Sequence, residues 1–164
     1  MYDPYNALRA MAFLNSLEGR PLKIYVGAKF EDANYASHVM DQLKLLGHGI
    51  TFDWTQFCMQ WDRIDKSDFQ AVIAYKKRAA QLDRYGVLDA DLFIQLYHSQ
   101  SQGAFVKLGL ACAVNKPCIV VKPEGLLVKD LVFLWGDTVT VVQTLGEMYS
   151  LVQSLSKVTK GSVG

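Results

Sequence analysis

Short apolar segments alternate along this chain with longer segments whose apolar residues recur every three or four positions. The short segments are rich in β-branched and aromatic residues; they are Lys23–Gly27, Ile50–Trp54, Leu92–Leu96, Cys118–Val121 and Thr138–Val142. Continuous apolar runs of this length are typical of strands that are buried on both faces of a parallel sheet. The alternation therefore predicts an α/β fold in which helices cover both faces of the sheet.

Right-handed crossover connections leave few topologies for five parallel strands joined by helices. We predict a doubly wound, five-stranded parallel sheet of flavodoxin-like order 2-1-3-4-5. The helical periodicity predicts helices over residues 33–46, 67–88, 103–114 and 126–134 and from residue 144 onward. The intervening segment 55–66 has no clear period and is expected to be a loop with a helical turn.

The spacings Ser67-x-x-Gln70 and Thr144-x-x-Glu147 predict capping boxes at the starts of two of these helices. A further helix is expected before the first strand, because Asp3 can cap a helix that begins at Pro4. We therefore predict a helical extension over residues 1–21, one α/β domain over residues 22–158 and a flexible tail over residues 159–164.

Composition excludes several classes of partner. The formal net charge is +1, which argues against the basic surface that nucleic-acid binding needs. No apolar run reaches the ~18 residues of a membrane span, so no membrane partner is expected. The three cysteines form no CxxC pair and no leader peptide is visible, so a cytoplasmic location is expected. The three histidines lack metal-ligand spacing, so we expect no metal site. We also expect no other cofactor.

Ligands of doubly wound sheets bind at the carboxyl ends of the strands, where the strand order reverses. The segments that follow the predicted strands are Gly27–Phe30, Asp53–Trp54, His98–Gly103 and Pro123–Gly125. The chain has neither a G-x-G-x-x-G fingerprint nor a P-loop. From the residues alone, Phe30 either stacks on a ligand or packs into the core of a tight turn, and the core position is the expectation we favour.

Lys107 is the unusual residue of this edge. It is expected in the first turn of the helix over residues 103–114, where a cation opposes the helix dipole. Two explanations stay open. Either the side chain reaches outward to solvent, or it meets an anionic ligand or a neighbouring carboxylate.

Three segments together resemble the nucleoside 2-deoxyribosyltransferase-like superfamily, which includes deoxyribonucleotide N-glycosidases and has TIR-like relatives. They are KIYVGAKF (23–30), QLDRYGVLDADLFIQLY (81–97) and GAFVKLGLACAVNKPCIVV (103–121). The resemblance extends over about residues 23–142 and implies a nucleoside or nucleotide ligand. It also implies a homodimer or higher homo-oligomer, because the segment Phe133–Gly136 resembles one that reaches into a neighbouring subunit's site.

The resemblance implies roles for individual residues. Tyr25 matches a tyrosine beside the nucleophile, Phe30 an aromatic that stacks on the base, and Asp83 an aspartate that contacts the base and moves protons. Lys107 stands where the family has its nucleophilic glutamate, and a sugar-binding acid of the family is replaced at about Ser101. We therefore expect a catalytic set of Asp83, Tyr25 and Lys107.

The remaining ligand-binding positions that we expect are Gly27, Phe30, Asp53, Ser101 and Gly103. The lysine matters because the family's reaction breaks an N-glycosidic bond through a covalent sugar–carboxylate intermediate. A cationic lysine cannot stabilise positive charge on the sugar, although a buried lysine of lowered pKa could act as an amine nucleophile.

Three hypotheses follow. The first, which we favour, is a nucleoside- or nucleotide-binding protein whose N-glycosidic bond chemistry is weak or lost. The second is an active deoxyribosyltransferase or N-glycosidase that uses a relocated carboxylate, for which Glu31, Asp53 and Glu124 are available. The third is a non-catalytic assembly or signalling module.

Overall fold

The structure, a computed structural model, describes residues 4–17, 19–97, 102–123, 134 and 136–156. Its centre is a five-stranded, all-parallel sheet in the order β2-β1-β3-β4-β5, as predicted. The strands are β1 (Lys23–Gly27), β2 (Gly49–Ile50), β3 (Leu92–Leu96), β4 (Cys118–Val121) and β5 (Val139–Val142). Every residue of β3 and β4 is buried, which explains why their sequences are continuous apolar runs with one exception, Gln95.

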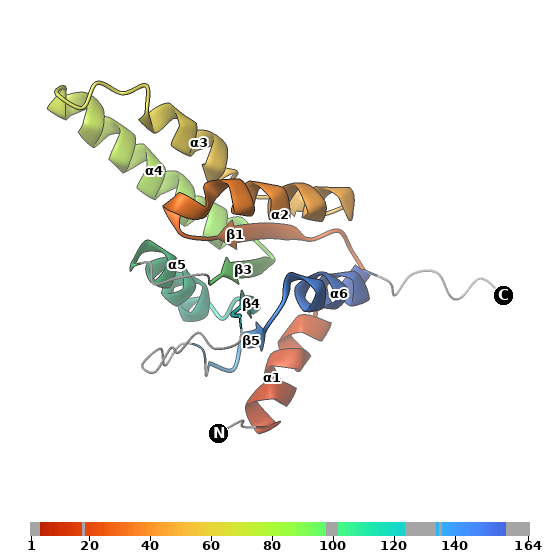
Figure 1. The fold of residues 1–164 in the computed structure, drawn as a ribbon. Helices are drawn as coiled ribbons and strands as arrows, with labels where there is room; N and C mark the ends of the chain where they lie inside the picture. Colours follow the sequence, from red (N-terminus) through yellow and green to blue (C-terminus); the bar gives the residue numbers. More distant parts are fainter. Residues whose placement is uncertain (1–3, 18, 98–101, 124–133, 135, 157–164) are drawn as a thin grey trace.

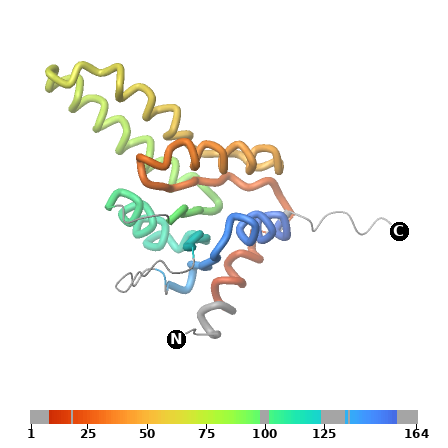
Figure 2. The backbone as a smooth tube through the Cα atoms, in the orientation of Figure 1, coloured from red at the N-terminus to blue at the C-terminus, as the bar shows by residue number. Residues whose placement is uncertain are grey.

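The helices alternate with these strands (Figure 1). They are α1 (Pro4–Asn15), the short 3-10 helix η1 (Phe30–Asp32), α2 (Ala33–Leu45), α3 (Trp54–Trp61), α4 (Phe69–Asp89), α5 (Gln102–Ala113) and α6 (Leu145–Ser156). Figure 1 shows α5 and α6 on opposite sides of the strands, as a doubly wound sheet requires. The tube in Figure 2 follows the same path and shows α3 and the start of α4 extending beyond the sheet.

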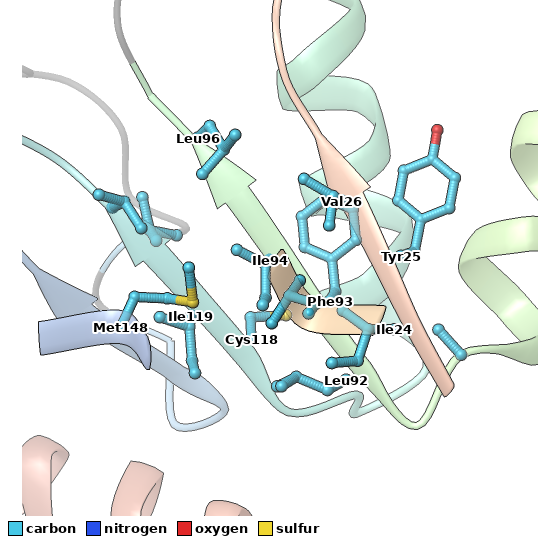
Figure 3. Packing of buried hydrophobic residues seen from close by; sticks show 14 of the residues in the cluster. Ile24, Tyr25, Val26, Leu92, Phe93, Ile94, Leu96, Cys118, Ile119 and Met148 are labelled. Atoms are coloured by element: carbon cyan, nitrogen blue, oxygen red, sulfur yellow. The ribbon is translucent and has the colours of Figure 1, made fainter. Parts of the chain in front are cut away.

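The core is continuous across the sheet (Figure 3). Ile24, Val26, Ile94 and Ile119 are fully buried, and Met148 of α6 joins this aliphatic layer. The expected N-terminal helix packs on the same body, since Leu14 is buried and the Gly19 amide donates to the Leu155 carbonyl at 2.8 Å. None of the described helices is both long and apolar enough to cross a membrane.

The second strand and the segment after it differ from the prediction. We expected a strand over Ile50–Trp54 and a loop over residues 55–66, but β2 ends at Ile50 and α3 begins at Trp54. The Asp53 carboxylate accepts hydrogen bonds from the backbone amides of Thr55 (3.2 Å) and Gln56 (3.4 Å), and so caps the helix. A local capping interaction therefore starts a helix where the apolar pattern predicted the end of a strand and a loop.

The capping residue of α4 is also different from the one predicted. Asp68, not Ser67, accepts from the amides of Gln70 (3.0 Å) and Ala71 (3.1 Å). The Ser67 hydroxyl instead donates to the Asp65 carboxylate at 2.6 Å. The second predicted capping residue is confirmed, because Thr144 Oγ1 accepts from the Glu147 amide at 3.1 Å. The helix predicted over residues 126–134 lies almost entirely outside the described residues.

The caps of α4 give a first test. We expect Asp68→Ala to lower the free energy of unfolding by about 1 kcal/mol, because two amides at the helix start lose their acceptor. Ser67→Ala is the matched control and should leave the free energy of unfolding close to that of the wild type. Chemical denaturation, together with hydrogen exchange of the first α4 amides, measures both. Equal losses of unfolding free energy in the two variants would contradict the assignment of Asp68 as the residue that caps α4.

His48 gives a second test, through pH. Its ring Nδ1 accepts from the Leu22 amide at 3.1 Å, and burial lowers the pKa of His48 from its ordinary value. The folded state therefore keeps the ring neutral at a pH where the unfolded chain is already protonated. This contribution to stability is present above about pH 6.5 and is lost as the pH falls through that value toward the folded-state pKa.

We therefore expect the melting temperature of the wild type to fall between pH 7.5 and pH 5.5. The melting temperature of His48→Asn should fall less over this range, because an amide oxygen can accept from the Leu22 amide without titrating. The exposed His38 provides the control, and His38→Asn should keep the wild-type decline. A decline of the same size in all three proteins would remove His48 as its cause.

Candidate functional site

The strand order of the sheet reverses between β1 and β3, and the candidate site lies there. Helix α4 packs on β1, and α5 packs on β3 and β4 and on α4. The site lies under these helices, on the face of the sheet to which Tyr25 and Phe93 belong. The rings of Tyr25 and Phe93 are stacked, with centroids 5.7 Å apart. Figure 3 shows the Tyr25 hydroxyl pointing away from the aliphatic core.

Three polar side chains from three elements meet at the Tyr25 hydroxyl. The hydroxyl donates a short hydrogen bond to the Asp83 carboxylate of α4. The Lys107 ammonium of α5 lies 3.3 Å from the Tyr25 oxygen and 3.5 Å from Asp83 Oδ2. The three residues expected to form a catalytic set are therefore brought together, although they are as far as 82 positions apart in the chain. We call them the Tyr25–Asp83–Lys107 cluster.

Lys107 is held inside the fold. Only 15% of its side chain is exposed, and its Nζ lies 5.4 Å from the centre of the Trp54 ring and 5.6 Å from that of Tyr25. Of the two explanations left open, the neighbouring carboxylate is the observed one. The expected place in the first helical turn is wrong, because α5 begins at Gln102 and Lys107 is its sixth residue. The helix dipole acts weakly at that depth.

Burial controls protonation in this cluster. Desolvation first, and then the Asp83 carboxylate, raise the pKa of Tyr25 well above its ordinary value. The phenol therefore stays protonated and acts as a donor to Asp83. The Cys58 thiol of α3 interacts with the charges of both Lys107 and Asp83. Burial raises the pKa of Cys58 to about 11, while the Lys107 ammonium opposes the rise. Neither group is prepared as an anionic nucleophile near neutral pH.

Trp54 and Asp53 form the side of the site next to α3. The Trp54 Nε1 donates to the Val26 carbonyl at 2.7 Å, which fixes the indole against the end of β1. Asp53, expected to bind ligand, uses Oδ1 to cap α3 and places Oδ2 3.8 Å from the Lys44 ammonium. Its carboxylate is therefore already engaged in the structure.

The other expected ligand residues are spread along the same edge. Phe30 is 54% exposed at the start of η1, so the favoured prediction that it packs in a core turn is wrong. Gly27 ends β1 and Gly103 lies in the first turn of α5. Ser101 and Glu124 lie outside the described residues. Glu31 is exposed and lies 3.9 Å from the Lys29 ammonium.

Sequence reasoning missed Gln95, a polar residue in the otherwise apolar strand β3. It is opposite Gly27 in the parallel register, and it is 1% exposed. A Cβ on Gly27 would lie 2.7 Å from Gln95 Oε1, so glycine is required for this side chain to fit. The signal was available, because one amide inside the run LFIQL breaks the apolar pattern.

The cluster is a neutral, hydrogen-bonded unit with an ammonium paired to a carboxylate. Among the described residues, no group of three or more His, Cys, Asp or Glu side chains is arranged to hold a metal ion. The arrangement offers an ammonium, aromatic faces and hydrogen-bonding groups at a ligand-binding edge. These groups are suited to recognise a polar aromatic or anionic small molecule.

Comparison with known proteins identifies the fold. No protein-family model and no curated protein matches this sequence. Among solved structures, the Clostridium botulinum CMP N-glycosidase BcmB aligns with a TM-score of 0.51 at 17% identity, over 80% of this chain and 95% of that one. This chain has the nucleoside 2-deoxyribosyltransferase-like fold. The fold that the sequence resemblance implied is therefore confirmed, and the chain is a structural relative of a CMP N-glycosidase.

Within this nucleoside 2-deoxyribosyltransferase-like fold, Gly86 sets the distance between α4 and Tyr25. A Cβ on Gly86 would lie 2.8 Å from Phe52 Cβ and 2.9 Å from two atoms of the Tyr25 ring. Gly109 of α5 is a matched control, because a Cβ there would meet nothing within 4 Å. Both glycines are helical, so alanine should gain the same helix propensity at each position.

We expect Gly86→Ala to be destabilised by about 1–3 kcal/mol, because the ring and the helix must separate. Gly109→Ala should instead be more stable by roughly 0.5–1 kcal/mol. Chemical denaturation gives both values. A gain in stability for both variants would contradict the close packing of α4 on Tyr25.

Proposed function

We propose that this protein binds a nucleoside or nucleotide at the carboxyl edge of β1 and β3, and that its N-glycosidic bond chemistry is weak or lost. One observation carries the proposal: the Lys107 ammonium, paired with Asp83 at 3.5 Å, stands where the sequence resemblance places a nucleophilic glutamate. The structural likeness to a CMP N-glycosidase supports the ligand class.

The charge of Lys107 is the physical reason for weak or lost chemistry. Cleavage of an N-glycosidic bond develops positive charge on the sugar ring, and a carboxylate on one face of the sugar stabilises that charge. At about 4 Å and an effective dielectric constant of about 20, a unit charge contributes about 4 kcal/mol. An ammonium in place of a carboxylate reverses the sign of this contribution. The same reversal favours an anionic group of the ligand, such as a phosphate.

Several features of this edge of the sheet suit such a ligand. The Lys107 ammonium is mostly sheltered from solvent, which strengthens its attraction for an anion. Phe30 presents an exposed ring at the end of the segment that follows β1, where it can stack on a base. Asp83, already hydrogen-bonded to Tyr25, has a second oxygen directed to Lys107 and is the acidic group of the cluster.

The test restores the carboxylate. We expect Lys107→Glu to release cytosine from CMP or dCMP at least tenfold faster than the wild type, because the site regains the charge that the reaction needs. Lys107→Met, which removes the ammonium without adding a carboxylate, is the control and should show no gain. Chromatography of the free base measures all three proteins.

Binding is measured in the same samples through the shift of the melting temperature. The wild type should be stabilised by CMP while the nucleotide stays intact, by about 2.7 kcal/mol at a hundredfold excess over Kd. Rapid base release by the wild type would refute the loss of chemistry and would favour a relocated carboxylate. Folded, ligand-binding Lys107→Glu protein without activity would show that more than one residue separates this site from catalysis.

A further inference from the structure

The amide oxygen of Gln95 is a buried acceptor without a hydrogen-bond donor among the described residues. Gln95 is the last residue but one of β3 and is 1% exposed. Its Nε2 donates to the Leu96 carbonyl at 3.3 Å, so the nitrogen is engaged and the oxygen is the free end. The reverse orientation would set two oxygens against each other. A buried oxygen without a hydrogen bond costs free energy of folding, so the absence of a donor to Gln95 points to a partner from outside the described residues.

The oxygen lies on the face of the sheet that holds the candidate site. In the parallel register, Tyr25 is opposite Phe93 and Gly27 is opposite Gln95. Since side chains alternate along a strand, Gln95 shares the face of the stacked Tyr25 and Phe93 rings, two residues nearer the carboxyl edge. The Cβ position of Gly27 points at Gln95 Oε1 and, at 3.2 Å, at the end of the Phe93 ring.

The chemistry of the partner follows from the orientation of the amide. Because Nε2 is held by the Leu96 carbonyl, a partner of Gln95 must present an N–H or O–H group. In the Tyr25–Asp83–Lys107 cluster, Tyr25 donates to Asp83 and Lys107 donates to both, so no donor of the cluster is directed to Gln95 and one Lys107 N–H is left for an anion. A bound nucleoside or nucleotide carries donors of two kinds, the amino group of its base and the hydroxyls of its sugar.

We propose that Gln95 Oε1 determines ligand specificity in this site by accepting a hydrogen bond from the base amino group or a sugar hydroxyl of the bound nucleotide. Gly27 is then required because any side chain there would occupy the place of the amide. This inference rests on the proposed function. It extends that function by naming a recognition residue apart from the charged cluster.

Gln95→Met tests the proposal, because methionine keeps the length of the side chain and removes the acceptor. We expect its affinity for CMP to fall roughly tenfold, as for the loss of one buried hydrogen bond. Gln153→Met on α6, which packs on β4 and β5, is the control and should bind CMP like the wild type. Calorimetry measures affinity, and the unliganded Gln95→Met protein should melt close to the wild type.

Three CMP analogues distinguish the source of the donor. One lacks the amino group of the base, dCMP lacks the 2′-hydroxyl, and the 3′-deoxy analogue lacks the 3′-hydroxyl. The wild type and Gln95→Met should bind equally the analogue that lacks the group from which Gln95 accepts. The variant should still lose affinity for the other two analogues. Equal affinity of the two proteins for CMP itself would assign Oε1 to a buried water and overturn the proposal, as would failure of Gln95→Met to fold.

Gly27→Ala supplies independent evidence. It should weaken CMP binding as Gln95→Met does, because a Cβ 2.7 Å from Oε1 must displace the amide. Adding Gln95→Ala should recover the stability that Gly27→Ala loses but not the affinity for CMP. Absence of CMP binding by the wild type would overturn the proposed function and this inference together. Binding by the wild type with an unchanged Gln95→Met affinity would overturn this inference alone.

Discussion

The parallel pairing of β1 with β3 is the constraint on which the site depends. Its register sets Tyr25 opposite Phe93 and Gly27 opposite Gln95, all on one face. The same pairing joins strands that are not neighbours in sequence, so it creates the reversal of strand order at which loops diverge. A shift of β1 by one residue would turn Tyr25 to the opposite face, away from Phe93, Asp83 and Lys107. Packing of the two central strands therefore determines which polar groups can meet.

The partly buried charges of the cluster depend on one another. Removing an ammonium or a carboxylate from water is costly, and the cost is offset only where each charge keeps partners. Asp83 has both the Tyr25 hydroxyl and the Lys107 ammonium, and the ammonium also lies over the Trp54 ring. The pair is therefore weak evidence for stability and stronger evidence for a specified arrangement. In the proposed function, this arrangement keeps an ammonium where bond cleavage needs a carboxylate.

Most of the fold could be predicted from the sequence because its strands are short, fully buried apolar runs. Lys23–Gly27, Leu92–Leu96 and Cys118–Val121 are strands with the predicted bounds. The prediction failed where a single side chain decides the local structure: Asp53 caps α3 inside the predicted strand, and Asp68 rather than Ser67 caps α4. Hydrophobic periodicity carries no information about which of two adjacent polar side chains bonds to a helix amide.

Prediction of the site followed the same division. The resemblance drew attention to Tyr25, Asp83 and Lys107, and the fold brings them together, but their spacing in the chain did not reveal the ion pair. Gln95 was missed because it lies inside a strand rather than after one. The buried position of Gln95 depends on Gly27, which lies 68 positions earlier in the chain. The two residues are adjacent only because β1 and β3 pair in this register. A polar residue inside a buried strand is expensive, and so it indicates a partner that strand periodicity alone cannot supply. In this sheet the glycine opposite Gln95 leaves room for its amide, and in the inference proposed above the bound nucleotide is the missing partner.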